Sequence, residues 1–154
     1  MARAAANAAS NAREGDGAVS TAVLFWGSAA DDQALLDSHG GPFHLLLGGD
    51  LVYGADAARV KQLMATVDRL LAHTDRATFL LGFQRRGSPL ESVLADARAR
   101  GQQGELLPGD WVVDMFQNRL DECSDFWQLC ILRFTRVHEE ERGASPPSQD
   151  GQTS

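Results

Sequence analysis

Apolar residues recur at helical spacing in the middle of the chain. Between Asp56 and His73 they follow spacings of 3, 1, 3, 3 and 1, at Val60, Leu63, Met64, Val67, Leu70 and Leu71. This pattern predicts an amphipathic helix. A second helix with a shorter apolar face is predicted before Gly101, at Leu90, Val93, Leu94 and Ala97. The alanine-rich segment 2–13 predicts a third helix from propensity alone.

Short runs of apolar and β-branched residues predict the strands. They are 19–25, 43–49 and 78–83, followed by 111–116 and 126–137. The last two leave no room for a helix between them, so we expect them to pair as an antiparallel hairpin. We expect the strand at 43–49 to be buried.

Two polar stretches are expected to lack regular structure. The first is a loop from Asp31 to Pro42, in which Asp31 and Asp32 would be solvated. The second is the tail at 138–154, whose run of glutamates leads into Gly, Ser, Pro and Gln and predicts disorder. One domain at 1–137 followed by a tail is therefore expected. Helices and strands alternate and end in a hairpin, which predicts an α/β fold with a mostly parallel sheet and one antiparallel strand near its edge.

Composition narrows the partners and the cellular compartment. The chain has 154 residues, a net charge of −7 and 44% hydrophobic residues, which suit one globular domain without a basic face for nucleic acid. No apolar run approaches the ~20 residues that span a membrane. Cys123 and Cys130 match no zinc-ligand spacing, so we expect no metal site and two reduced, partly buried thiols. Reduced thiols favour the cytoplasm, with the nucleus as the alternative.

The polar residues after the strand at 43–49 form the most informative feature. Gly48 and Gly49 end this strand, and Asp50 and Tyr53 follow. Ligands of parallel α/β sheets bind beyond the carboxyl ends of the strands, so Asp50 would point into a crevice with Tyr53 above it. Two alternatives remain. Asp50 could cap the helix that begins near Asp56 or close a turn, and Tyr53 could be a packed core residue.

Three motifs in a fixed order resemble a known family. Asn7 and Asn11 lie on one face of the first helix, Trp26-Gly27 follows the first strand, and Asp50-Leu51-Val52-Tyr53 follows the second. With the terminal hairpin, this order resembles the seven-strand, class I S-adenosylmethionine-dependent methyltransferases. The resemblance is to the branch with many protein-lysine methyltransferases (nicotinamide N-methyltransferase-like, or methyltransferase family 16), and it covers roughly residues 4–137. It implies a Rossmann-like sheet with strand order three, two, one, four, five, seven, six.

The resemblance also implies a function and a set of site residues. The cofactor would be S-adenosylmethionine, and the substrate would be a lysine side chain of a protein. Asp50 and Tyr53 would be catalytic and line the channel for the amine. Trp26, Gly27 and Gly49 would bind the cofactor. A tryptophan that only fills the rim of the sheet is the alternative for Trp26.

The chain departs from the family pattern at its beginning. Family members start with two further strands, the first with a glycine-rich cofactor turn and the second with an acidic residue for the ribose. Neither has a counterpart here, so we expect a partial methyltransferase sheet that lacks the first two strands, with no natural neighbour for 19–25. An alternative function follows, namely a catalytically inactive, truncated remnant that binds another protein. Exposed strand edges would then allow self-association.

Overall fold

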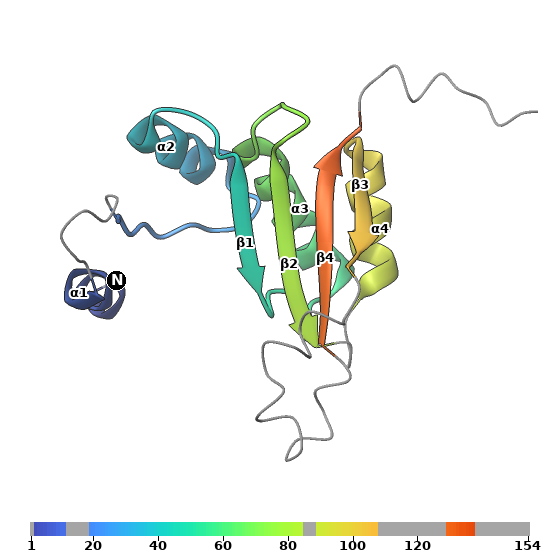
Figure 1. Cartoon of the computed structure of the whole chain (residues 1–154), viewed down its shortest axis with the longest axis horizontal. Coiled ribbons are helices and arrows are strands. Elements are labelled where there is room, and N and C mark those ends of the chain that lie inside the picture. The colour runs from blue at the N-terminus through green and yellow to red at the C-terminus, as the bar shows by residue number, and fades with distance from the viewer. Residues whose placement is uncertain (1, 12–18, 85–88, 108–128, 138–154) are drawn as a thin grey trace, which may run out of the picture.

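The computed structural model describes residues 2–11, 19–84, 89–107 and 129–137. Within these ranges the chain forms helices and strands that alternate for most of its length, with one layer of helices behind a sheet (Figure 1). The elements are α1 (Ala2–Asn11), α2 (Ala29–His39), β1 (Leu45–Gly49), α3 (Ala57–Leu70), β2 (Thr78–Gln84), α4 (Leu90–Ala99), β3 (Gln102–Leu106) and β4 (Leu129–Arg136).

The strands form one mixed sheet in the order β1-β2-β4-β3. β1 pairs with β2 in parallel, and β4 runs antiparallel to both of its neighbours. β1, β2 and β3 therefore point the same way, and the antiparallel strand lies next to the β3 edge. The expected α/β class is confirmed, with an antiparallel strand near one edge of the sheet.

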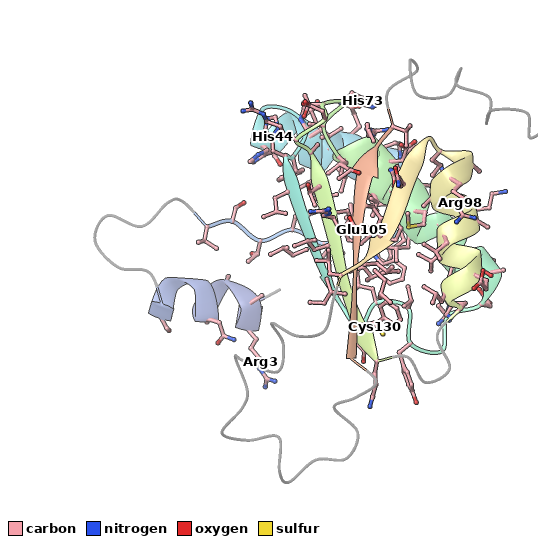
Figure 2. The ribbon with its side chains drawn as sticks, turned by 45° about the vertical axis from the view of Figure 1, so that its right-hand side comes forward. Arg3, His44, His73, Arg98, Glu105 and Cys130 are labelled. Carbon is pink, nitrogen blue, oxygen red and sulfur yellow. The ribbon has the colours of Figure 1, made fainter. Side chains whose placement is uncertain are left out.

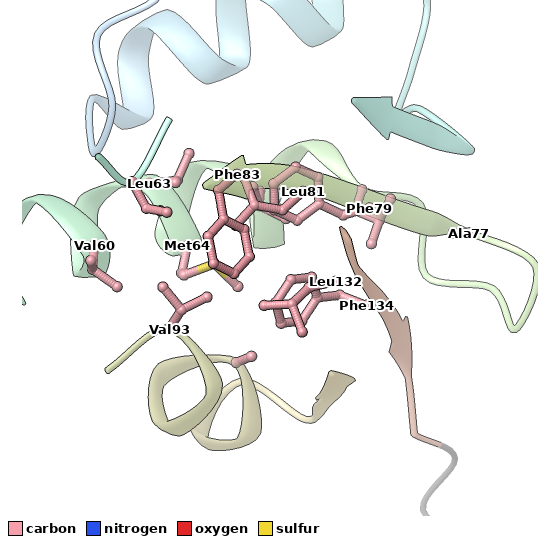
Figure 3. Packing of buried hydrophobic residues seen from close by; sticks show 14 of the residues in the cluster. Val60, Leu63, Met64, Ala77, Phe79, Leu81, Phe83, Val93, Leu132 and Phe134 are labelled. Atoms are coloured by element: carbon pink, nitrogen blue, oxygen red, sulfur yellow. The ribbon is translucent and has the colours of Figure 1, made fainter. Parts of the chain in front are cut away.

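The hydrophobic core lies between the sheet and the helices α3 and α4. Every apolar residue of the predicted α3 stripe is buried, which confirms that helix and its inward face. Phe79 of β2 and Phe134 of β4 stack with ring centroids 5.6 Å apart and form the centre of the core (Figure 3). Burying side chains of this size supplies about 1.5 to 3 kcal/mol each. α4 adds Val93 and Ala97 to the same core.

An arginine of β4 binds the carboxyl end of α3 and the residues that follow it. The last carbonyls of a helix have no partner within the helix. The Arg136 guanidinium donates to the backbone carbonyls of Asp68, Leu71 and Ala72 at 2.7, 3.2 and 3.3 Å. It also donates to Oδ1 of Asp68 at 2.9 Å. This fork of donors fastens the last described strand to a helix that ends more than 60 residues earlier.

The predicted strand at 19–25 is wrong. These residues are extended but pair with no strand in the described part of the chain. Val19 and Phe25 are each 68% exposed, and Val23 is 53% exposed. β-branched residues favour an extended backbone, but a strand also needs a neighbour to accept its hydrogen bonds. We call this segment, residues 19–25, the arm.

The predicted polar loop from Asp31 to Pro42 is also wrong, because most of it forms α2. Ser28 is the N-cap, and its Oγ accepts a hydrogen bond from the Asp31 N–H at 3.3 Å. The helix ends at Gly40, whose φ of 85° suits glycine. Asp32 is not solvated but only 1% exposed, because α2 packs against α3.

The strand predicted at 43–49 exists as β1, but it is not buried. Leu45 and Leu47 are 53% and 73% exposed, because their side chains lie on the face of the sheet opposite Leu46, which packs on the core. Figure 1 shows α3 and α4 behind the sheet, and no described helix covers its front face. The resulting open face is apolar near β1 and polar near β3, where Arg133 pairs with Glu105.

The carboxyl-terminal prediction is right in part. β4 lies inside the predicted strand 126–137, but its antiparallel partners are β2 and β3. β3 was not predicted. The other predicted strand of the hairpin, 111–116, lies outside the described residues, as do Cys123 and the tail 138–154. The Cys130 side chain is partly buried, as expected.

Candidate functional site

Asp50 stands where the parallel strand pair ends. Its backbone N–H donates to the Gly82 carbonyl of β2 at 2.7 Å, one step beyond the last residue of β1. It has a φ of 55° and is the one non-glycine residue with positive φ among those described. Aspartate tolerates this left-handed conformation better than most residues. The side chain is exposed at the rim of the sheet.

The residues between Asp50 and Tyr53 fasten this turn to the core. Leu51 packs over Gly48, where an added Cβ would lie 2.8 Å from the leucine Cδ1. Val52 is 1% exposed and belongs to the core cluster. Through the turn, the partly buried Leu51 and the buried Val52 thus lie between two exposed residues. These two apolar side chains hold the Asp50 carboxylate and the Tyr53 ring at the surface.

The capping alternative for Asp50 and the core alternative for Tyr53 now have answers. The helix cap is Asp56, whose Oδ1 accepts the Arg59 N–H at 2.8 Å, so capping is not the role of Asp50. Among the described residues, no hydrogen bond or ion pair reaches the Asp50 carboxylate. Tyr53 is 59% exposed, which rules out a packed core tyrosine.

The Trp26-Gly27 turn lies against the side of α3. The Gly27 N–H donates to Oγ1 of Thr66 at 2.9 Å. Gly27 has a φ of 85°, and an added Cβ would lie 2.9 Å from Cγ of Gln62. Glycine is therefore required here for its conformation and for close packing. The half-buried Trp26 side chain packs on the core.

An open hollow of about 350 Å³ adjoins this turn. Its lining residues are Leu24, Phe25, Trp26, Arg59 and Gln62. Two aromatic residues thus share this lining with an arginine, whose guanidinium has no hydrogen-bond or ion-pair partner within the described ranges. Such a lining suits a flat ring with an anionic group attached.

The five predicted site residues fall into two places. Trp26 lines the hollow, and Gly27 is its neighbour in the chain. Gly49, Asp50 and Tyr53 lie at the rim of β1, and none of them lines the hollow. Figure 2 helps to orient the rim, because His44 and His73 mark the opposite end of the sheet and Cys130 marks the rim end.

The buried carboxylate of Asp32 supports the Trp26-Gly27 turn through Thr66. Oδ2 of Asp32 accepts a hydrogen bond from Thr66 Oγ1 at 3.3 Å and one from Arg69 Nε at 2.6 Å. Thr66 Oγ1 also accepts a hydrogen bond from the Gly27 N–H. These hydrogen bonds form a relay that joins the turn to Asp32 of α2. Sequence reasoning missed this relay. The available signal was a second, polar stripe on α3, at Arg59, Gln62, Thr66 and Arg69.

Gly27→Ala is expected to destabilise the fold by about 2 to 3 kcal/mol, from backbone strain and from the contact with Gln62. Chemical denaturation followed by circular dichroism measures this change. Gly54→Ala is the matched control, because Gly54 has a φ of 62° with nothing within 4 Å of an added Cβ. It should cost only about 1 kcal/mol. Equal losses in the two variants would show that the contact with Gln62 does not constrain the turn.

Other kinds of site find less support in the described part of the chain. It holds no cluster of three potential metal ligands. None of its helices combines the length and apolar character needed to cross a bilayer. A comparison with protein-family models finds no family that matches, and a comparison with curated proteins finds no similar protein.

Proposed function

We propose that this chain is an S-adenosylmethionine-dependent methyltransferase that methylates a lysine side chain of a protein substrate. The observation that carries the proposal is the state of Asp50. Asp50 has a left-handed backbone conformation at the rim of the parallel pair β1 and β2. Its carboxylate has no hydrogen-bond or ion-pair partner among the described residues. Unusual backbone conformations concentrate at functional sites, and ligands bind at such rims.

The topology of the sheet supports the same proposal. The order β1-β2-β4-β3, with β4 antiparallel, coincides with strands four, five, seven and six of the resembled family. In that alignment Asp50 and Tyr53 follow strand four, which is where the family motif stands. The exposed arm coincides with strand three, whose neighbour in the family would be strand two. We therefore also propose that the whole domain has a Rossmann-like fold.

Asp50 and Tyr53 have the chemistry that amine methylation requires. The attacking nitrogen must be neutral and aligned with the methyl carbon, and the product nitrogen is positively charged. The Asp50 carboxylate would accept an N–H of the amine, orient its lone pair and offset the developing charge. The Tyr53 ring would contact the lysine side chain and favour a cation at its face by roughly 0.5 to 2 kcal/mol.

The residues around the hollow fit one side of a cofactor. S-adenosylmethionine would supply a methyl group activated by a sulfonium. The Trp26 and Phe25 rings suit contact with a flat base, and the Arg59 guanidinium suits a carboxylate. Gly49 has no atom within 4 Å of an added Cβ, so close approach of a ligand to its backbone is sterically open.

Calorimetric titration of the chain with S-adenosylhomocysteine tests the proposal. We expect a dissociation constant in the micromolar range, and Trp26→Ala should weaken binding at least about tenfold, a change of 1.4 kcal/mol. Phe43→Ala is the control, because Phe43 is a partly buried aromatic residue that stacks on His39 outside the hollow. A folded sample that binds no S-adenosylhomocysteine would contradict the proposal for this chain.

A second function is favoured by the exposed apolar residues of β1. A catalytically inactive methyltransferase remnant would use its incomplete sheet to bind another protein. Leu45 and Leu47 lie on an open face beside a free strand edge, and free edges recruit further strands. Binding of S-adenosylhomocysteine without methyl transfer to any protein substrate would favour this second function.

A further inference from the structure

The outer edge of β1 presents unpaired backbone groups. The Thr78 N–H donates to the His44 carbonyl at 2.9 Å, and the Asp50 N–H donates to the Gly82 carbonyl at 2.7 Å. Alternate residues of a paired strand face the same neighbour, so the even-numbered residues of β1 face β2. The N–H and C=O groups of Leu45, Leu47 and Gly49 therefore point outward, where no other described strand accepts them.

This edge also lacks the features that usually protect a sheet edge. β1 contains no charged residue and no proline. The side chains of Leu45 and Leu47, on the open face of the sheet, are more than half exposed. The opposite edge differs, because β3 is polar and carries Glu105 in an ion pair with Arg133. Charges discourage the addition of a further strand. Of the two edges, β1 is the one suited to receive a strand.

The arm is a strand-forming segment without a strand to pair with. Its sequence, Val-Ser-Thr-Ala-Val-Leu-Phe, has no charge and is rich in β-formers. Its base is fixed, because the Phe25 N–H donates to Oδ2 of Asp31 at 3.2 Å and the Ser28 N–H donates to the Phe25 carbonyl at 3.0 Å. From there the arm runs away from the sheet on the β1 side (Figure 1). The arm and the edge of one chain therefore do not meet.

We propose that two copies of this chain exchange their arms. The arm of each copy adds as a strand to the outer edge of β1 in the other copy. The backbone groups of Leu45, Leu47 and Gly49 then gain partners, which is the usual way in which an extended segment joins a sheet. The exchange is reciprocal, so it closes into a symmetric dimer rather than a chain of molecules.

Charge favours this pairing over other contacts between two copies. Each copy carries a net charge of −7, so most of its surface repels a second copy. The arm and β1 are both uncharged, and their contact brings no like charges together. The exposed Val19 and Val23 of one copy would cover the exposed leucines of the other. This inference is independent of the proposed methyltransferase activity.

Sedimentation velocity of the full chain tests the exchange. The measurement is made at about 100 µM, where an interface with a micromolar dissociation constant is nearly saturated. We expect a dimer. Val23→Pro in the arm and Leu47→Lys on the edge should each raise the dimer dissociation constant at least about tenfold. Both side chains are exposed, so circular dichroism should show an unchanged monomer fold.

Leu106→Lys is the matched control, since Leu106 is 51% exposed on the β3 edge and should leave the dimer intact. An equimolar mixture of Val23→Pro and Leu47→Lys should regain dimers, because it retains one intact arm and one intact edge that fit each other. A monomeric wild-type chain would overturn the proposal. So would a Val23→Pro variant that still dimerises, because β1 would then pair with β1, and so would growth into larger polymers.

Discussion

Asp50→Asn is expected to lower the rate of methyl transfer roughly 100-fold, the loss typical of removing one preorganised electrostatic group from an active site. Asparagine keeps the shape of the side chain and tolerates a φ of 55° at least as well as aspartate. It removes the negative charge that would offset the charge developing on the nitrogen. Transfer of a radiolabelled methyl group to a protein substrate measures the effect. Affinity for S-adenosylhomocysteine should stay within about twofold of the wild type, because Asp50 does not line the hollow.

The control for this variant is Asp75→Asn. Asp75 is an exposed aspartate in the connection between α3 and β2, at the end of the sheet away from Asp50. Its substitution should leave the transfer rate unchanged and should change the free energy of unfolding by no more than about 0.5 kcal/mol. Full activity in Asp50→Asn would show that the carboxylate only shapes the turn, and would remove the observation on which the proposed function depends.

Arg69→Met should destabilise the fold by about 3 kcal/mol, the largest change in stability that we expect from a single charged residue of this chain. Asp32 is 1% exposed, and Arg69 pairs with it at 2.5 Å. Removing the arginine leaves a buried carboxylate with only the Thr66 hydroxyl as its partner. Such losses amount to about 3 to 5 kcal/mol. The lower value applies because the Arg69 side chain is 35% exposed.

A double-mutant cycle isolates the cause of this loss. Asp32→Asn removes the buried charge, so Asp32→Asn combined with Arg69→Met should recover at least half of the lost free energy of unfolding. Urea denaturation of the four proteins gives the required values. Additive losses in the double variant would show that Arg69 stabilises the fold through packing of its side chain rather than through the charge of Asp32.

The elements that sequence predicted well share one property, which is an apolar face at regular spacing. α3 is the best example, because every residue of its predicted stripe is buried. α2 has no such stripe, and its one buried residue is the charged Asp32. A local signal for α2 existed in Ser28 followed three positions later by Asp31, which together resemble a capping box. β3 has a sequence with little strand preference and owes its conformation to β4.

The two places of the candidate site, the rim of β1 and the hollow beside Trp26, were predictable from the sequence to different degrees. Asp50 and Tyr53 lie at the carboxyl end of β1, as expected, because the strand and its terminal glycines are local features. Their exposure was harder to foresee, since it depends on how Leu51 and Val52 fill the core beneath. The environment of Trp26 was not predictable from local sequence, because its turn is positioned by α3 residues about 40 positions later.

The position of β4 between β2 and β3 also determines the order in which this sheet can be completed. During synthesis, β2, α4 and β3 leave the ribosome before β4. β3 has no described strand neighbour except β4, so it cannot join the sheet until the last strand arrives. The Arg136 contacts with the end of α3 form at that same moment. Because these contacts join distant parts of the chain, their formation carries a large loop-closure cost. Folding of the β3 side therefore awaits residue 136, and until then the unfinished edge of β2 is open to other chains.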